Sequence, residues 1–384
     1  MAPIQPFRIA VPDADLSDLR ERLHRTRWPD AECVDDWSQG IPLAYTRELA
    51  EYWASEYDWR AREAALNHFD QFTTDIDGLA IHFIHHRSTR PDAFPLLITH
   101  GWPGSIVEFH KVIEPLNDAG FHVVCPSLPG YGFSGKPTTT GWGVERIAAA
   151  WDELMLRLGY RHYGAQGGDW GAAVTTQIGR NQGHCVAIHT NMPLGRPPKD
   201  LTDPTPDEIA ALERVGYYQR WDSGYSKQQS TRPQTLGYGL TDSPVGQLAW
   251  IVEKFWSWTD CDGHPENVLT RDELLDNVML YWITGSGASS ARLYWESFGS
   301  FAGGQRVTLP TGVAAFPKEI LRAPRHWCED NYTITHWTEM PRGGHFAAFE
   351  QPELFAGDVA GFFERFRGAG LIPSPAPGQA TDAG

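Results

Sequence analysis

The sequence lacks the features that mark membrane, secreted or nucleic-acid-binding proteins. No run approaches the roughly 18 apolar residues that a membrane helix needs, and no charged start followed by an apolar core resembles a secretory signal. Basic residues are scarce, with 32 Lys and Arg against 48 Asp and Glu, and the formal net charge of −16 opposes binding to a phosphate backbone. We therefore expect a cytoplasmic protein without a membrane anchor and without a nucleic-acid partner.

Cysteine is also scarce, and no metal motif is present. The five cysteines are widely spaced and form no paired redox or zinc motif, so we expect reduced thiols. Three histidines cluster at His82, His85 and His86. Alternation from Ile81 to His86 predicts a strand with a polar face there rather than a metal site. The sequence thus predicts no metal and no other cofactor.

The most informative segment is Gly167 to Gly171, in which an aspartate lies between small residues. Small neighbours let a chain turn sharply from a strand into a helix and lift a nucleophile clear of the sheet. The preceding residues Tyr163 to Ala165 are apolar, and Ala172 to Ile178 contains no helix breaker. Asp169 is therefore a candidate nucleophile, and a solvated or helix-capping aspartate in a glycine-rich turn is the alternative.

Two partners follow in the order that hydrolases of the α/β class require, which is nucleophile, acid, histidine. His345 comes late in the chain after two glycines and is the candidate base, with a structural histidine as the alternative. Glu319 follows the apolar run Val313 to Phe316 and Pro317, where a strand ends and a loop begins, and is the candidate orienting acid. Competing acids lie in polar surroundings typical of surface charges, and they are Glu329, Asp330 and Glu339.

A loop from His100 to Ser105 directly follows the apolar run Phe94 to Ile98. Its glycines and proline keep the backbone out of regular structure. The amide of Trp102 can then join the amide of Trp170, which follows the candidate nucleophile, as an oxyanion hole. The Trp102–Pro103 bond can adopt the cis form. An ordinary loop after a strand is the alternative.

These segments resemble those of the microsomal-type and juvenile-hormone-type epoxide hydrolases. The resemblance covers nearly the whole chain apart from its C-terminal end. Membrane-bound members carry an N-terminal hydrophobic anchor, for which Met1 to Phe7 leaves no room. The matching segments are His100 to Ser105, Gly167 to Gly171, Arg342 to Glu350 and, in the N-terminal region, Thr26 to Pro29, Tyr57 to Arg60 and Gln71 to Thr73.

The resemblance implies an α/β-hydrolase fold and conversion of an apolar, aryl or alkyl epoxide to a vicinal diol. In the family the elbow aspartate is the nucleophile, a glutamate and a histidine handle water, and two lid tyrosines hold the epoxide oxygen. By motif these tyrosines are Tyr225 and Tyr294, which we favour over Tyr217, Tyr218, Tyr238 and Tyr281. The expected partners are a small epoxide and water, and the sequence leaves a homo-oligomer open.

The residue types suit this chemistry. A carboxylate can displace the oxygen at a tetrahedral epoxide carbon and leave an ester on the enzyme, which water deprotonated by a histidine can attack. Phenols, with an ordinary pKa of about 10, are proton donors for the ring oxygen.

A haloalkane dehalogenase is one alternative, but a halide requires N–H donors and no proton. A noncatalytic small-molecule receptor on the same fold is another, although such proteins usually lose a triad member. A serine esterase would need a serine in the elbow.

Composition shifts divide the chain into five expected segments. A leucine pattern at Leu16, Leu19 and Leu23 predicts a helix near the start. Five prolines between positions 193 and 206 indicate an exit from the core, and the last residues are rich in Pro, Ala and Gly. The expected segments are an N-terminal helical arm (1–77), a mostly parallel core (78–195), a mainly helical lid (196–304), the rest of the core (305–370) and a disordered tail (371–384).

Overall fold

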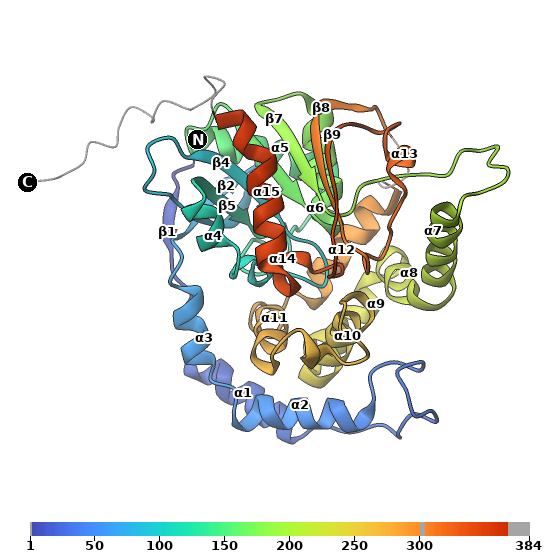
Figure 1. Ribbon diagram of the computed structural model, residues 1–384. Helices are drawn as coiled ribbons and strands as arrows, with labels where there is room; N and C mark the ends of the chain where they lie inside the picture. Colours follow the sequence, from blue (N-terminus) through green and yellow to red (C-terminus); the bar gives the residue numbers. More distant parts are fainter. Residues whose placement is uncertain (1, 300–303, 368–384) are drawn as a thin grey trace, which may run out of the picture.

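Short apolar runs form a central nine-stranded sheet in the computed structural model, which describes residues 2–299 and 304–367 (Figure 1). The strand order is β1-β2-β3-β5-β4-β6-β7-β8-β9. β1, β2, β3 and β5 pair antiparallel, and the remaining pairs are parallel, so the expected mostly parallel sheet is confirmed. The strands are β1 (Gln5–Phe7), β2 (Gln71–Ile76), β3 (Leu79–His86), β4 (Phe94–Thr99), β5 (Phe121–Pro126), β6 (Tyr163–Gly167), β7 (Cys185–Thr190), β8 (Val307–Ala315) and β9 (Tyr332–Glu339).

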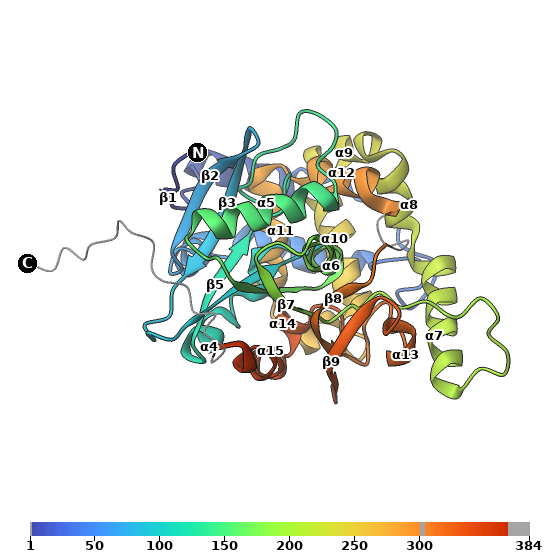
Figure 2. The ribbon, with the colours of Figure 1, turned by 90° about the horizontal axis from the view of Figure 1, so that it is seen from above.

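Helices cover both faces of this sheet, with α5 and α6 on one side and α4 and α15 on the other (Figure 2). α5 buries Ile147, Trp151 and Leu154, whose spacing of four and three residues places them on one helical face. The sheet is therefore enclosed between two helical layers, as parallel sheets require. The helices of the core are α4 (Ile113–Asp118), α5 (Val144–Arg157), α6 (Asp169–Asn181), α13 (Arg325–Cys328), α14 (Ala347–Glu350) and α15 (Pro352–Arg367).

The histidine-containing strand β3 corrects one expectation. The strand itself is confirmed, but the prediction that its histidines lie on a polar face is wrong, because His82 and His85 are buried. β3 lies inside the sheet between β2 and β5, and the ring of His82 makes hydrogen-bond contacts with Ser127 Oγ and Gln71 Oε1, both at 2.9 Å. Burial lowers the pKa of His82 to about 3, so the ring is a neutral structural group.

Between β7 and β8, the described residues 196–299 contain six α-helices, and we call this segment the helical insertion. It falls within residues 196–304, for which a lid stays a prediction, and capping boxes begin two of its helices, at Thr205 with Glu208 and at Thr270 with Glu273. The helices lie below and beside the carboxyl ends of the strands in Figure 1. They are α7 (Pro206–Tyr217), α8 (Gly224–Thr231), α9 (Pro233–Asp242), α10 (Pro244–Trp258), α11 (Arg271–Thr284) and α12 (Gly287–Ser297).

The N-terminal arm packs against the helical insertion rather than against the sheet alone (Figure 1). Its helices are α1 (Asp13–His24), α2 (Leu43–Ser55) and α3 (Trp59–Leu66). The three leucines expected on one face of α1 are buried. Trp37 stacks on Trp256 of α10 with ring centroids 5.0 Å apart. The tail expected at 371–384 lies outside the described residues.

A buried carboxylate joins the arm to the insertion. Asp276 of α11 is 2% exposed and accepts hydrogen bonds from Tyr57 Oη, at 2.8 Å, and from Arg62 Nε, at 2.9 Å. Burial raises the pKa of Asp276 even though the guanidinium of Arg62 works to lower it. The charge of Asp276 therefore depends on its partner from the arm.

We predict that Arg62→Met lowers the free energy of unfolding by about 3 kcal/mol, because it leaves a buried carboxylate without its counter-charge. Urea denaturation measures this change. The control is Arg25→Met, whose pair with Glu21 is exposed (78% and 57% of the two side chains), so the loss should stay below about 1 kcal/mol. Equal losses in the two variants would contradict a stabilising role for the Arg62–Asp276 pair.

Candidate active site

The candidate nucleophile lies at a sharp turn between β6 and α6. β6 ends at Gly167, α6 begins at Asp169, and Asp169 has a φ of 51°, in the left-handed region that non-glycine residues seldom occupy. A Cβ atom at Gly171 would lie 1.9 Å from the carbonyl oxygen of Thr99 in β4, so this position has room for glycine only. The turn therefore packs directly on the neighbouring strand and presents the carboxylate of Asp169 at the carboxyl end of the sheet.

The candidate base and acid come from the loops after β9 and β8. His345 Nδ1 lies 2.5 Å from Glu319 Oε1, and His345 Nε2 lies 3.4 Å from Asp169 Oδ2. Glu319 and His345 are 1% and 5% exposed, so water hardly screens these charges. The three groups stand in a row, with the imidazole between two carboxylates.

The competing acids lie elsewhere, on the surface. Glu329 pairs with Arg325, and Glu339 pairs with Arg322. Asp330 is exposed. Of the four acids considered from the sequence, Glu319 is the one beside the imidazole.

The electrostatic surroundings favour a protonated imidazole in this state. Burial acts to lower the pKa of His345, but the charges of Glu319 and Asp169 raise it well above its ordinary value. Loss of the charge on Asp169 would remove one of these two effects. The proton affinity of His345 is therefore linked to the chemical state of Asp169.

The oxyanion-loop candidate is held close to the nucleophile. The amide of Trp102 donates to Asp169 Oδ1 at 2.8 Å, and the Trp102–Pro103 peptide is cis. Two side chains of α11 hold the loop from the other side, since Asn277 Nδ2 donates to Pro103 O at 2.7 Å and Tyr281 Oη donates to Gly104 O at 2.8 Å. Trp170 is buried in the first turn of α6, whose amides point toward the N-terminal end of the helix.

An aromatic cavity of about 280 Å³ adjoins the nucleophile. Tyr225 stacks on Trp102, with ring centroids 4.8 Å apart and planes 9° apart. Tyr294 meets Trp170 edge-on at 4.8 Å. The cavity is lined by Asp169, Trp170, Met192, Tyr218, Tyr225, Tyr294, Phe298, Ile320 and Leu321. Most of this lining is apolar, with a carboxylate and phenol groups as its polar members.

Three phenols face this cavity, one more than the sequence suggested. Tyr225 Oη lies 3.1 Å from Tyr218 Oη, and Tyr294 Oη is buried with no hydrogen-bond partner within residues 2–299 and 304–367. Burial raises the pKa of Tyr225 and Tyr294 well above the ordinary value, so both stay protonated at neutral pH. Tyr218 was ranked lower from the sequence because no motif singles it out.

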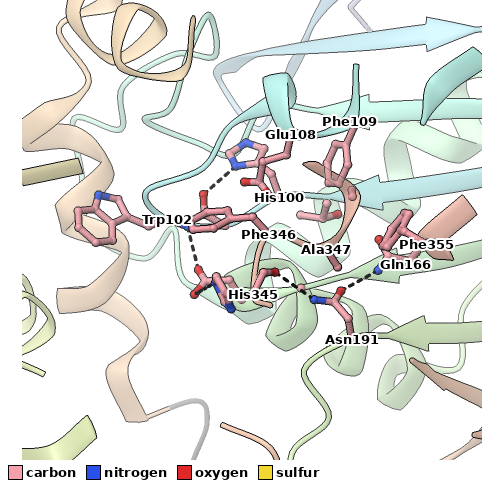
Figure 3. Close-up of a pocket in the computed structure, with 15 residues that line it drawn as sticks. His100, Trp102, Glu108, Phe109, Gln166, Asn191, His345, Phe346, Ala347 and Phe355 are labelled. Atoms are coloured by element: carbon pink, nitrogen blue, oxygen red, sulfur yellow. Dashed lines mark hydrogen bonds and ion pairs between the residues drawn. The ribbon is translucent and has the colours of Figure 1, made fainter. Parts of the chain in front are cut away.

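A second, much smaller cavity of about 20 Å³ lies behind the nucleophile, and Figure 3 shows Glu108, Asn191 and His345 around it. Glu108 belongs to a 3₁₀ turn, and its carboxyl packs so closely on Gly104 that a Cβ atom there would lie 1.3 Å from Oε1. Burial raises the pKa of Glu108 to about 8. The one sequence signal for this group is the presence of a glutamate inside the short apolar run Ile106 to Phe109.

Within the part of the chain that the structure describes, no cluster of three or more His, Cys, Asp or Glu is arranged to hold a metal ion. None of the described helices combines the length and the apolar composition that a bilayer crossing requires.

Two family models match the chain. The model described as "Epoxide hydrolase N terminus" matches residues 4–109, and the model of the alpha/beta hydrolase fold matches residues 95–227. The first match covers the arm and the oxyanion-loop candidate, and the second covers the elbow. Together they span the arm, the first part of the core and the start of the helical insertion.

Relatives match over almost their full length. A Stigmatella aurantiaca protein assigned to the epoxide hydrolases is 54% identical over 376 residues, which cover 95% of this chain and 86% of that protein. Epoxide hydrolase 1 of Oryctolagus cuniculus is 38% identical and is matched over 94% and 88% of the two chains. The structure of Aspergillus niger epoxide hydrolase has a TM-score of 0.87 at 34% identity, with 94% and 96% of the two chains covered. The chain therefore belongs to the epoxide hydrolase family and has the α/β-hydrolase fold.

Proposed function

We propose that this chain opens an apolar epoxide to a vicinal diol in two steps that share Asp169. The observation that carries the proposal is the row of Asp169, His345 and Glu319 at the wall of an aromatic cavity that also exposes phenol groups. The apolar lining suits an aryl or alkyl epoxide. Helices 196–299 act as a lid over this cavity, because they supply both candidate donor tyrosines.

In the first step, a carboxylate oxygen of Asp169 attacks a ring carbon of the epoxide. A new C–O ester bond forms, the ring C–O bond breaks, and its electron pair leaves on the ring oxygen. Tyr225 and Tyr294 donate hydrogen bonds to this developing alkoxide, and one of them supplies the proton. This assignment is supported by the cavity lining, to which Tyr225, Tyr294 and Asp169 all belong.

In the second step, water attacks the ester carbonyl of Asp169. His345 Nε2 takes the proton, Glu319 holds the imidazole through Nδ1, and the oxyanion forms within reach of the Trp102 and Trp170 amides. Esterification removes the negative charge of Asp169, so the pKa of His345 falls and its proton is released to restore the tyrosine that protonated the alkoxide. The neutral ring then takes the proton of the attacking water and ends the cycle protonated, as it began. Collapse of the tetrahedral state releases the diol and restores the carboxylate.

The small cavity offers a place for the attacking water. Its volume of about 20 Å³ suits a single water molecule, and the buried atoms Thr99 Oγ1 and Gln166 Oε1 have no partner within the described residues. Glu108 is protonated at neutral pH and can donate a hydrogen bond while adding no negative charge beside Asp169. We assign Glu108 to the positioning of this water.

The alternatives are less well supported by the site. A halide leaving group would require N–H donors, whereas this cavity offers the phenols of Tyr218, Tyr225 and Tyr294. A noncatalytic receptor would not require a buried imidazole between two carboxylates, which is costly to maintain. We further propose a cytoplasmic location, because all five cysteines are free thiols.

The covalent step predicts that Asp169 exchanges oxygen with solvent. After many turnovers of styrene oxide in ¹⁸O water, mass analysis should find label in the peptide that contains Asp169, and a peptide that contains Asp358 should stay unlabelled. Asp169→Ala should lower kcat by more than about 1,000-fold. Diol formation that continues undiminished in Asp169→Ala would overturn the covalent mechanism.

The donor role predicts unequal effects on the two steps. Tyr225→Phe and Tyr294→Phe should each slow alkylation by about 10- to 100-fold, because each removes a donor to the alkoxide, and should change ester hydrolysis far less. Single-turnover tryptophan fluorescence separates the two rates. Tyr217→Phe, at a position 57% exposed, is the control and should change neither rate. Equal slowing of both steps would count against the donor role.

The raised pKa of Glu108 predicts a pH-dependent difference in stability. The folded state holds this proton more tightly than the unfolded state, so the stabilisation is complete below the ordinary pKa of 4.5 and is lost as pH rises toward 8. Glu108→Gln keeps the neutral form at every pH. Its melting temperature, measured by circular dichroism, should therefore rise relative to wild type between about pH 5 and pH 8.

The control for this measurement is Glu51→Gln, at an exposed position of α2. The difference between its melting temperature and that of the wild type should not change with pH. If the melting temperature of Glu108→Gln also differs from that of the wild type by the same amount at every pH, the carboxyl of Glu108 is already ionised at neutral pH in the folded protein.

A further inference from the structure

A second buried charge lies beside the proposed donor Tyr225. Asp222 ends a π-helical turn that runs from Tyr218 to Asp222, two residues before α8 begins, and it is 8% exposed. Single π-helical turns are uncommon and frequent at functional sites. This turn brings the carboxylate of Asp222 against α10.

Three donors from the end of α10 surround this carboxylate. Lys254 Nζ lies 2.7 Å from Asp222 Oδ1, while Trp258 Nε1 at 2.6 Å and Ser257 Oγ at 3.2 Å donate to Oδ2. Asp222 therefore ties the segment that precedes Tyr225 to the last turn of α10.

The ion pair is buried and charged. Burial acts to lower the pKa of Lys254, but the carboxylates of Glu253 and Asp222 raise it above its ordinary value, so the ammonium group is retained. Burying two charges costs desolvation energy, and apolar residues of similar size often stabilise a protein as well. A contribution to stability is therefore a weak explanation for the buried Asp222–Lys254 pair. The contacts of this pair suggest a different role.

The indole of Trp258 links two reacting groups. Its ring lies 5.1 Å from the ring of Tyr225 and 5.2 Å from that of His345, and its backbone carbonyl accepts from the amide of His345 at 2.9 Å. Lys254 Nζ lies 4.9 Å from the centroid of the Tyr225 ring. Two of the three donors that Asp222 holds, Lys254 and Trp258, thus lie against Tyr225, and Trp258 also lies against His345.

We propose that Asp222 is a positioning residue that orients the donor Tyr225 and the base His345 together, through Lys254 and Trp258. The inference rests on the proposed function, since it requires Tyr225 to act in alkylation and His345 in ester hydrolysis. One carboxylate on the helical insertion thereby sets the geometry of both steps. Small displacements at reacting groups lower rates steeply, because catalysis depends on preorganised distances.

The test compares three variants in single-turnover experiments with styrene oxide, each at a temperature well below its own Tm. Asp222→Asn keeps the shape but removes the charge that holds both donors, and it should slow alkylation and ester hydrolysis by about 10- to 100-fold each. Trp258→Phe leaves the Asp222–Lys254 pair intact but removes the indole N–H, and it should slow both steps in the same way. It keeps the test decisive if Asp222→Asn does not fold.

The control for lost stability is Leu154→Ala, which leaves a void under the buried face of α5, a helix that contributes no residue to either cavity beside Asp169. Both of its rates should stay within about threefold of wild type although its free energy of unfolding is lower. The inference is overturned if Asp222→Asn leaves both rates within about threefold of wild type, or if Leu154→Ala slows both steps as much. Label in Asp169 of the wild-type enzyme tests the proposed function separately, because it does not depend on Asp222.

Discussion

The contact between Gly171 and the carbonyl of Thr99 is the constraint on which the rest of the site depends. Because no side chain separates α6 from β4 there, the elbow and the loop that follows β4 lie close enough for the Trp102 amide to reach Asp169. The left-handed backbone of Asp169 is tolerated only where surrounding packing holds it. A side chain at position 171 would push α6 away from β4 and so separate the Asp169 carboxylate from the Trp102 amide.

With that contact in place, the carboxylate of Asp169 lies between two cavities that differ in polarity. On one side lies a mostly apolar cavity lined by three tyrosines, the place proposed for the epoxide. On the other side lies a small polar pocket with a protonated glutamate and the imidazole. Since the two sides share only Asp169 and its immediate neighbours, substrate and water need not compete for the same space.

The sequence predicted the local parts of this arrangement well. The elbow, the oxyanion-loop segment and Glu319 at a strand end each carry their signal within a few neighbouring residues, and the sheet follows from short apolar runs. The domain boundaries and the site roles stay predictions. Glu108 and Asp222 are not predicted from the sequence because their neighbours, such as His345 for Glu108 and Lys254 for Asp222, belong to distant segments. Tyr218 ranks below Tyr225 and Tyr294 because no motif distinguishes it from the other tyrosines. The alternation of residues around His82 led to a wrong prediction of a polar face. His82 is buried because strands pair on both sides of β3, which the pattern of a single strand does not show.

Two successive residues of α11 bind partners from different parts of the chain. Asp276 is held by Tyr57 and Arg62 of the arm, while Asn277 holds the carbonyl of Pro103 in the oxyanion loop. α11 thus contacts the arm through Asp276 and the oxyanion-loop candidate through Asn277. The N-terminal region is therefore connected through α11 to the oxyanion-loop candidate, which it supports without contacting the Trp102 amide.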